Sequence, residues 1–136
     1  MTPKSAGKAA PVVPGAATLM IVDDDEEVRK ILAKGCAAAG YRVLMADNGL
    51  RLVSTLRSEK VEVVLLDINM PWVSGLRVGK AIKEDPGLRH IKVVYVTGVH
   101  EREAECRDTG CDGFIRKPFA LRLVLETIEK LLKPGA

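Results

Sequence analysis

Five short apolar runs are spaced along the chain, and the clearest of them ends at a carboxylate. Residues 61–66 (VEVVLL) form an almost unbroken apolar run that stops at Asp67. A short run rich in Val is typical of a strand buried on both faces, as in the middle of a parallel sheet. We predict a strand here and at each of the other four runs, which span 18–22, 41–46, 91–96 and 113–116.

Between these runs, apolar residues recur every three or four positions, which is typical of amphipathic helices. In residues 26–39 the acidic Glu26 and Glu27 fall in the first turn, where they suit the positive end of a helix, and Gly40 follows as a terminating glycine. The same pattern predicts four further helices, at about 50–59, 76–84, 101–109 and 121–132.

Strands that alternate with helices predict a parallel sheet that helices cover on both faces, with right-handed crossovers. We therefore predict an α/β fold of the flavodoxin-like, doubly wound type, with a five-stranded parallel sheet in the order 2-1-3-4-5 and five helices. This domain would span residues 18–133. Residues 1–17 are rich in Pro, Gly and Ala and contain no aromatic residue, so we predict a disordered tail there.

Composition argues against a nucleic-acid-binding, membrane-spanning or secreted protein. The 136 residues fit one domain, and a net charge of +3 with both signs interspersed gives no reason to expect nucleic-acid binding. No apolar run approaches the roughly 20 residues of a membrane span, and no apolar segment of a secretory signal follows Lys4 and Lys8. We expect a cytoplasmic protein without membrane contact.

The three cysteines, Cys36, Cys106 and Cys111, form no CxxC pair. We interpret them as reduced, small apolar residues, with a redox role for Cys106 and Cys111 as the minor alternative.

Carboxylates follow two of the predicted strands. Asp23 and Asp24 come after the first strand and Asp67 after the third, and the predicted order places these strands side by side at the switch point of the sheet. Three carboxylates held together repel one another, so at least one should have a raised pKa or need a cation. Mg²⁺ suits such a site, because it takes oxygen ligands and is commonly held by one or two carboxylates plus phosphate oxygens.

A carboxylate beside Mg²⁺ can act as a nucleophile on a phosphoryl group and form an aspartyl phosphate. Such a site also needs a second cation and a hydroxyl. Lys117 and Thr97 stand at the ends of the fifth and fourth predicted strands and would supply them at the same rim. Together these residues supply the nucleophile, the metal ligands, the second cation and the hydroxyl that such a transfer needs, which none of them does alone.

Four motifs at strand ends carry a family resemblance: IVDDD at 21–25, LLDINMP at 65–71, VTG at 96–98 and FIRKPF at 114–119. With these motifs in this order and spacing, the chain resembles the receiver domains of bacterial two-component response regulators. In length it is similar to the stand-alone regulators of the chemotaxis type. The resemblance covers nearly everything except the tail.

The resemblance implies a phosphoacceptor and a Mg²⁺ site. Asp67 would accept the phosphoryl group and also contact the metal. Asp24 would bind Mg²⁺ directly, Asp23 mainly through a metal-bound water, and Asn69 through its backbone carbonyl.

It also implies a conformational switch. Thr97 would be the switch hydroxyl, and Lys117 would bind the phosphate. Phe114 matches the aromatic position whose rotamer reports activation, although it lacks the hydroxyl of the tyrosine that is common there. The peptide bond between Lys117 and Pro118 would be cis.

A signalling switch of this kind is not an enzyme with an external substrate. The phosphoryl donor would be a histidine kinase or a histidine phosphotransfer protein, which would meet the first helix and the loops near Asp67. An output protein would meet the surface of the fourth helix, fifth strand and fifth helix. The domain could also form a dimer that depends on phosphorylation.

Two alternatives belong to other classes. An enzyme of the haloacid dehalogenase type also uses an Asp nucleophile, Thr, Lys and Mg²⁺ on a similar sheet. It needs an acid two residues after the nucleophile, where this chain has Asn69, and it carries its nucleophile on an early strand. A pseudo-receiver would bind partners without phosphorylation, and the complete set of acidic residues, Thr97 and Lys117 argues against it.

Overall fold

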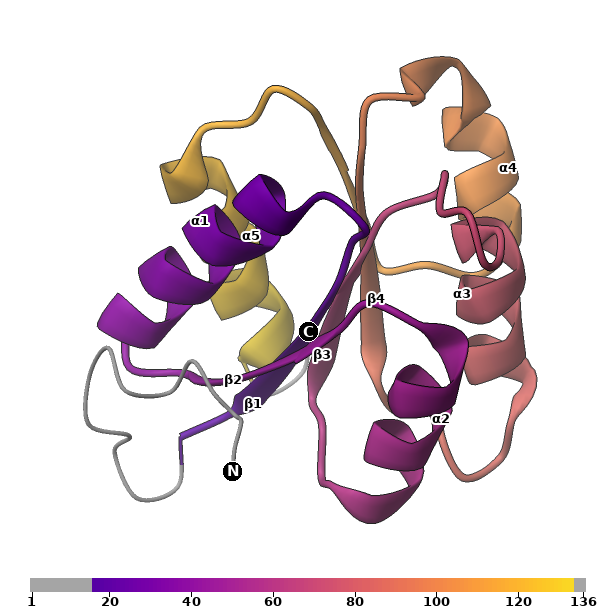
Figure 1. Cartoon of the computed structure of the whole chain (residues 1–136), viewed down its shortest axis with the longest axis horizontal. Helices are drawn as coiled ribbons and strands as arrows, with labels where there is room; N and C mark the ends of the chain where they lie inside the picture. The colour runs from indigo at the N-terminus through magenta and orange to yellow at the C-terminus, as the bar shows by residue number, and fades with distance from the viewer. Residues whose placement is uncertain (1–15, 134–136) are drawn as a thin grey trace.

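A computed structural model describes residues 16–133, so residues 1–15 of the predicted tail lie outside the described part. Its five strands form one parallel sheet in the order β2-β1-β3-β4-β5, which confirms the predicted topology (Figure 1). The strands are β1 (Thr18–Val22), β2 (Arg42–Ala46), β3 (Val63–Leu66), β4 (Lys92–Thr97) and β5 (Gly113–Arg116).

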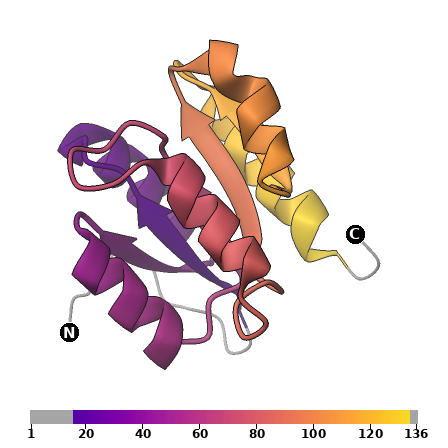
Figure 2. The ribbon, with the colours of Figure 1, turned by 90° about the vertical axis from the view of Figure 1, so that its right-hand side faces the viewer.

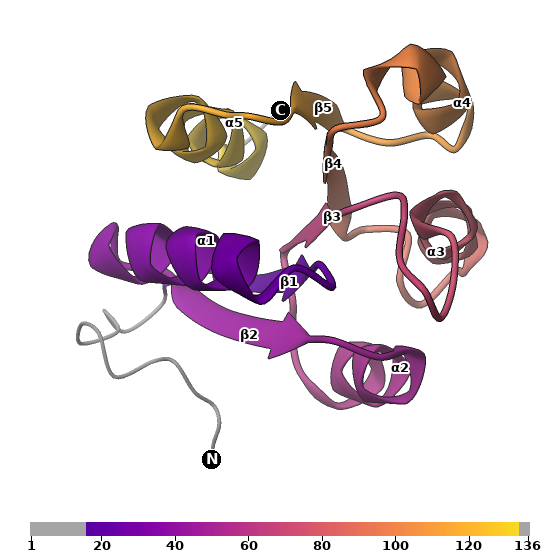
Figure 3. The same cartoon turned by 45° about the horizontal axis from the view of Figure 1, so that its top comes forward.

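Helices cover both faces of the sheet, again as predicted. Two of them, α1 and α5, lie on one face, and the other three lie on the opposite face (Figure 1, Figure 3). Their bounds are α1 (Glu26–Ala38), α2 (Gly49–Ser58), α3 (Gly75–Glu84), α4 (Glu103–Asp108) and α5 (Leu121–Leu132). Among residues 16–133, none of the helices has the length and hydropathy that crossing a membrane requires.

The alternation of side chains along each strand builds one apolar core on each face. In β4, Val94 and Val96 face the core under α1 and α5, whereas Val93 and Tyr95 face the opposite core. We call this second one the α3-side core; its buried members are Met20, Val22, Ala46, Leu52, Leu56, Val61, Val64, Leu66, Ile68, Met70, Ile82, Ile91, Val93, Tyr95 and Cys106.

Local sequence explains where most helices begin. The side chains of Asp25, Asn48 and Ser74 cap α1, α2 and α3 by accepting hydrogen bonds from backbone N–H groups of the first turn. Beyond α1, Gly40 has a φ of 100°, a left-handed conformation that glycine adopts without strain.

The region after β4 differs from the prediction of one helix over 101–109. A 3₁₀ turn, η2 (His100–Arg102), comes first, and α4 is a short helix of 6 residues. Arg102 at its start provides no side-chain cap, and Cys106 is its only buried residue, so neither capping nor packing supports a longer helix. The other boundaries lie within two residues of the predicted ones.

Cys36, Cys106 and Cys111 are all free thiols, and the first two are buried. Burial raises the pKa of the Cys36 thiol from 9.0 to about 12. The folded protein therefore keeps this proton at pH values where the unfolded chain loses it, so the thiol makes stability fall as the pH rises above about 9.

We expect Cys36→Ala to lose less stability than the wild type between pH 9 and pH 12, because it has no thiol to titrate. The thiol accounts for about 1.4 kcal/mol of the wild-type loss at pH 10. Urea unfolding of both proteins at neutral pH and at pH 10 measures the difference, and equal losses in the two proteins would contradict it.

Candidate functional site

The site lies where β1 and β3, two adjacent inner strands of the sheet, end together. The last residues of these strands, Val22 and Leu66, are paired in register, and the Asp67 N–H donates a hydrogen bond of 3.0 Å to the Val22 carbonyl. Asp23 and Asp67 therefore leave the sheet at the same level, with Asp24 next to them. One carboxylate oxygen of each of these three residues lies within 4.8 Å of the others, as the strand order predicts.

Asp23 and Asp67 are buried, with 2% and 8% of their surface exposed, whereas Asp24 is exposed. Burial is the largest cause that raises the pKa of Asp23, and repulsion from the Asp67 carboxylate adds to it. Hydrogen bonds from Lys117 and from the Asp25 N–H oppose this shift, but the net direction is upward. The raised pKa that the sequence led us to expect in this cluster thus falls on Asp23.

Lys117 follows β5 and reaches across the sheet to the cluster. Its Nζ donates to Asp23 Oδ2 at 2.8 Å and to Asp67 Oδ2 at 3.2 Å. Burial lowers the pKa of Lys117, but the hydrogen bonds and the attraction of both carboxylates outweigh burial and raise the pKa, so the side chain stays cationic. The Lys117–Pro118 peptide bond is cis, as the resemblance implied.

Thr97 is the last residue of β4, and its side chain is fully buried. Its Oγ1 accepts a hydrogen bond of 3.2 Å from the Val99 N–H, so the hydroxyl keeps its own proton for donation. The backbone carbonyl of Thr97 accepts a bond of 2.9 Å from the Lys117 N–H, which joins the ends of β4 and β5. The sheet thus brings Thr97 and Lys117 to one rim.

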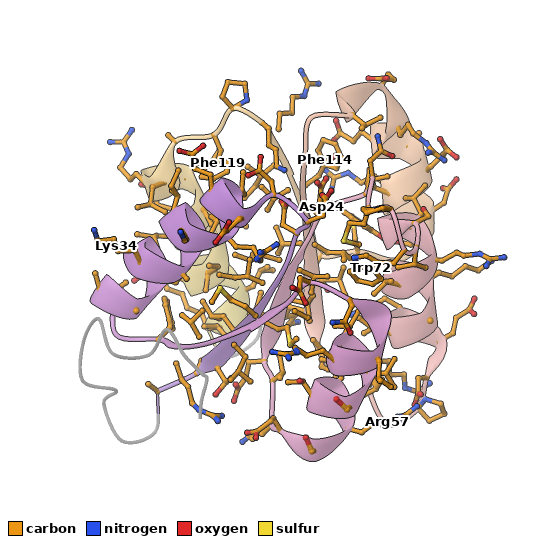
Figure 4. The ribbon with its side chains drawn as sticks, viewed as in Figure 1. Asp24, Lys34, Arg57, Trp72, Phe114 and Phe119 are labelled. Atoms are coloured by element: carbon orange, nitrogen blue, oxygen red, sulfur yellow. The ribbon has the colours of Figure 1, made fainter. Side chains whose placement is uncertain are left out.

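The structure places the two remaining predicted residues in the loop after β3 and in β5. Asn69 is exposed in the loop after β3 and forms an isolated antiparallel bridge with Ser74. Phe114 in β5 is half-buried and packs against the α3-side core, at the end of the sheet toward which Asp24 also lies (Figure 4).

Two residues that sequence reasoning did not assign to the site contact its backbone. Arg29 in α1 donates from Nη1 to the Asp23 carbonyl at 2.6 Å. Gly75, at the start of α3, lies so close to Asp67 that a Cβ atom would overlap the Asp67 carbonyl oxygen. An arginine in a helix and a glycine after a loop carry no distinctive signal in sequence, because both contacts depend on how the helices pack.

These features define a class of protein: an α/β domain with a lysine-paired cluster of carboxylates, at the switch point of its sheet, that could hold a divalent cation. Comparison with known proteins narrows the class to a family. The chain belongs to the response regulator receiver domain family, whose model matches residues 19–129. This assignment sets aside the haloacid dehalogenase alternative.

Three relatives illustrate the similarity. DivK of Brucella anthropi, a polar-differentiation response regulator, is 37% identical over 117 residues, which are 85% of this chain and 95% of DivK. The chemotaxis response regulator CheY4 of Vibrio cholerae is 25% identical with a TM-score of 0.79, over 86% of this chain and 99% of CheY4. The response regulator TrrA of Thermotoga maritima, solved in complex with Mg²⁺-BeF, is 27% identical with a TM-score of 0.78, over 85% and 99% of the two chains.

Proposed function

We propose that this receiver domain accepts a phosphoryl group on Asp67 in the presence of Mg²⁺ and so switches a protein-interaction surface. The observation that carries the proposal is the convergence of Asp23, Asp24 and Asp67 with Lys117 bonded to two of them. Three carboxylates and one ammonium leave a surplus of negative charge, which a divalent cation would offset. The TrrA structure with Mg²⁺-BeF supports the same use of this fold.

The donor set suits Mg²⁺, because every side-chain ligand it offers is oxygen. Asp24 and Asp67 would hold the ion directly, Asp23 through a water, and Asn69 through its backbone carbonyl. When bound, Mg²⁺ supplies neutralisation of charge on the phosphoryl oxygens.

The side chains of this site would each take one part in the transfer. A carboxylate oxygen of Asp67 attacks phosphorus, and the bond between phosphorus and the donor's imidazole nitrogen breaks. Lys117 exchanges its bonds to the carboxylates for one to a phosphoryl oxygen, while the Thr97 hydroxyl donates to another. The protein thus catalyses only its own modification and acts as a switch rather than as an enzyme on an external substrate.

The phosphoryl donor would be a histidine kinase or a histidine phosphotransfer protein that binds over α1 and the loop after β5. An apolar groove of about 440 Å³ supports this, because it is lined by Val28, Ile31, Pro118 and Phe119 and has Lys117 in its wall. Ile31 is 49% exposed in this groove, which leaves its side chain free to contact a partner.

The output would be read on the face formed by α4, β5 and α5. Phosphorylation would draw Thr97 toward Asp67, let Phe114 turn inward, and shift the population of conformations of this face, which could also pair with a second copy. The three free thiols suit a reducing compartment such as the cytoplasm.

Labelling with a small acyl-phosphate donor tests the proposal. We expect incorporation of one phosphoryl group that requires Mg²⁺ and is removed by hydroxylamine, as an acyl phosphate must be. A label that resists hydroxylamine would contradict an aspartyl phosphate, and the absence of any label would favour a pseudo-receiver.

Removal of Lys117 should make the cluster depend on Mg²⁺ for stability. Lys117→Met leaves Asp23 and Asp67 without their cation. Breaking a buried pair costs roughly 3–5 kcal/mol, and the partial exposure of Lys117 reduces the expected loss to about 2 kcal/mol. Because Mg²⁺ would take over the neutralisation, millimolar Mg²⁺ should raise the Tm of the variant more than that of the wild type.

Lys83→Met is the matched control, because Lys83 is paired with Asp112 at 3.0 Å, away from the cluster, and is similarly shielded. It should lose stability without gaining any additional response to Mg²⁺. A Lys117→Met variant whose Tm responds to Mg²⁺ no more than that of Lys83→Met would contradict the assigned metal site.

A further inference from the structure

Tyr95 is a buried residue of β4 for which the phosphorylation chemistry has no use. It precedes Thr97 by two positions, so both side chains lie on the same face of the sheet, toward α3 and α4. Its side chain is fully buried, and its hydroxyl lies 3.0 Å from Oγ1 of Thr109, the C-cap residue directly after α4. Tyr95 therefore connects the strand that carries Thr97 to the carboxyl end of α4.

The direction of this hydrogen bond follows from the proton count. Thr109 Oγ1 donates its single proton to the Cys106 carbonyl at 2.6 Å, so Tyr95 must be the donor to Thr109. Burial raises the pKa of Tyr95 to about 12, which keeps the phenol in its donor form. The chain of bonds from Tyr95 through Thr109 to Cys106 also satisfies a carbonyl of the last turn of α4.

The neighbouring helix α3 leaves room for this contact. Gly79, in the interior of α3, faces the Tyr95 hydroxyl so closely that a Cβ atom there would overlap the oxygen. Glycine destabilises a helix interior. Its presence at this position of α3 is explained by the space that the missing side chain leaves for the Tyr95 hydroxyl. Three neighbouring elements, β4, α3 and the end of α4, thus meet at one hydroxyl. Figure 2 shows the ribbons of α3 and α4 on the same face of the sheet, next to β4.

The amino end of α4 is held much less firmly. Arg102 provides no side-chain cap, and it pairs with Glu105 within the same segment. Glu103 approaches Arg116 of β5 at 3.7 Å, but the Arg116 side chain is 64% exposed, and such surface pairs contribute little. Residues 98–102 connect this loosely held end directly to Thr97.

We propose that Tyr95 is a positioning residue of the switch: through Thr109 it holds the carboxyl end of α4 on the sheet, so that movement begun at Thr97 is confined to the amino end of α4. The inference rests on the proposed function, because only a displacement of Thr97 on phosphorylation gives the held end this role. A partner on the α4, β5 and α5 face would then recognise a tilt of α4 rather than a displacement of the whole helix.

Hydrogen exchange of the whole chain, with and without Mg²⁺ and beryllofluoride, tests this inference. The backbone N–H groups of Thr109 and Gly110 report on the held end, because they donate to the Cys106 and Arg107 carbonyls. Without beryllofluoride, Tyr95→Phe should exchange roughly fivefold faster at these two positions, which corresponds to the loss of one ordinary hydrogen bond. With beryllofluoride, the wild type should change protection only over 100–105, and Tyr95→Phe over 100–110.

Two further variants make the comparison specific. Thr109→Val removes the acceptor together with the Thr109 bond to the Cys106 carbonyl, so these positions should exchange at least as fast as in Tyr95→Phe, with no further increase when Tyr95→Phe is added to it. Thr127→Val is the matched control, because its hydroxyl donates within α5 to the Leu123 carbonyl at 2.8 Å, and its α4 exchange should equal that of the wild type.

The outcomes separate the two proposals. Equal exchange of residues 107–110 in the wild type, Tyr95→Phe and Thr109→Val, with an intact response to beryllofluoride, would overturn the role of Tyr95 alone. A wild type that shows no response to beryllofluoride anywhere would overturn the proposed function and the positioning role with it.

Discussion

Asp67→Asn is expected to reduce Mg²⁺-dependent labelling to background. The amide cannot act as the nucleophile, and the neighbouring carboxylates cannot easily replace it. Asp23 is 2% exposed and has both oxygens engaged, one by the Asp25 N–H and one by Lys117. Asp24 is exposed and would be a metal ligand. The measurement is the initial rate of label incorporation from a small acyl-phosphate donor.

The same substitution should change the stability of the fold little. It weakens the Lys117–Asp67 contact of 3.2 Å, but Lys117 keeps its shorter bond of 2.8 Å to Asp23. Asp67 Oδ1 accepts a hydrogen bond of 2.7 Å from the Ile68 N–H, which the Asn side-chain carbonyl can also accept. The substitution also removes the repulsion that helps to raise the pKa of Asp23. A lost label in a fully stable protein would therefore report chemistry rather than unfolding.

Asp47→Asn provides the matched control, because Asp47 follows β2 as Asp67 follows β3 but is exposed and takes no part in the cluster. It should incorporate label at the wild-type rate. Label that persists in Asp67→Asn but disappears in Asp24→Asn would place the acceptor on Asp24 and contradict the assignment.

The sheet could be predicted from sequence because its physical causes are local. Apolar runs such as 61–66 leave few alternatives to a buried strand, and the alternation with helices restricts the order of the strands. The segment over 101–109 was predicted less well, because only Cys106 is buried there and the helical period is weak.

The predicted site could be placed for a similar reason. Asp23, Asp67, Thr97 and Lys117 end or directly follow strands, and the carboxyl ends of parallel strands meet at one edge. Sequence could not show that Lys117 bonds to two carboxylates at once, since that depends on the side-chain conformation. The contact between Tyr95 and Thr109 was also beyond prediction, because it crosses from the sheet to a helix end.

Gly75→Ala is expected to have the largest effect on stability. In the wild type, the Gly75 N–H donates to the Ile68 carbonyl at 2.7 Å. A Cβ atom here would overlap the Asp67 carbonyl oxygen and come within 2.8 Å of the Asp67 carbonyl carbon and 2.9 Å of Ile68 Cα. These are backbone atoms that cannot rotate away, so the start of α3 and the end of β3 must separate. Overpacking costs about 1–3 kcal/mol, and we expect a loss of about 3 kcal/mol.

The site should be damaged together with the fold, because the displaced backbone carries the Asp67 carboxylate away from Asp23 and Lys117. Urea unfolding measures the first effect and the labelling rate the second. Gly87→Ala is the control: its Cβ would meet the Asp85 side chain only at an ordinary 3.4 Å, so its stability should stay within about 0.5 kcal/mol of the wild type. If Gly75→Ala were as stable and as readily labelled as Gly87→Ala, the close approach of α3 to Asp67 could not be what positions the acceptor.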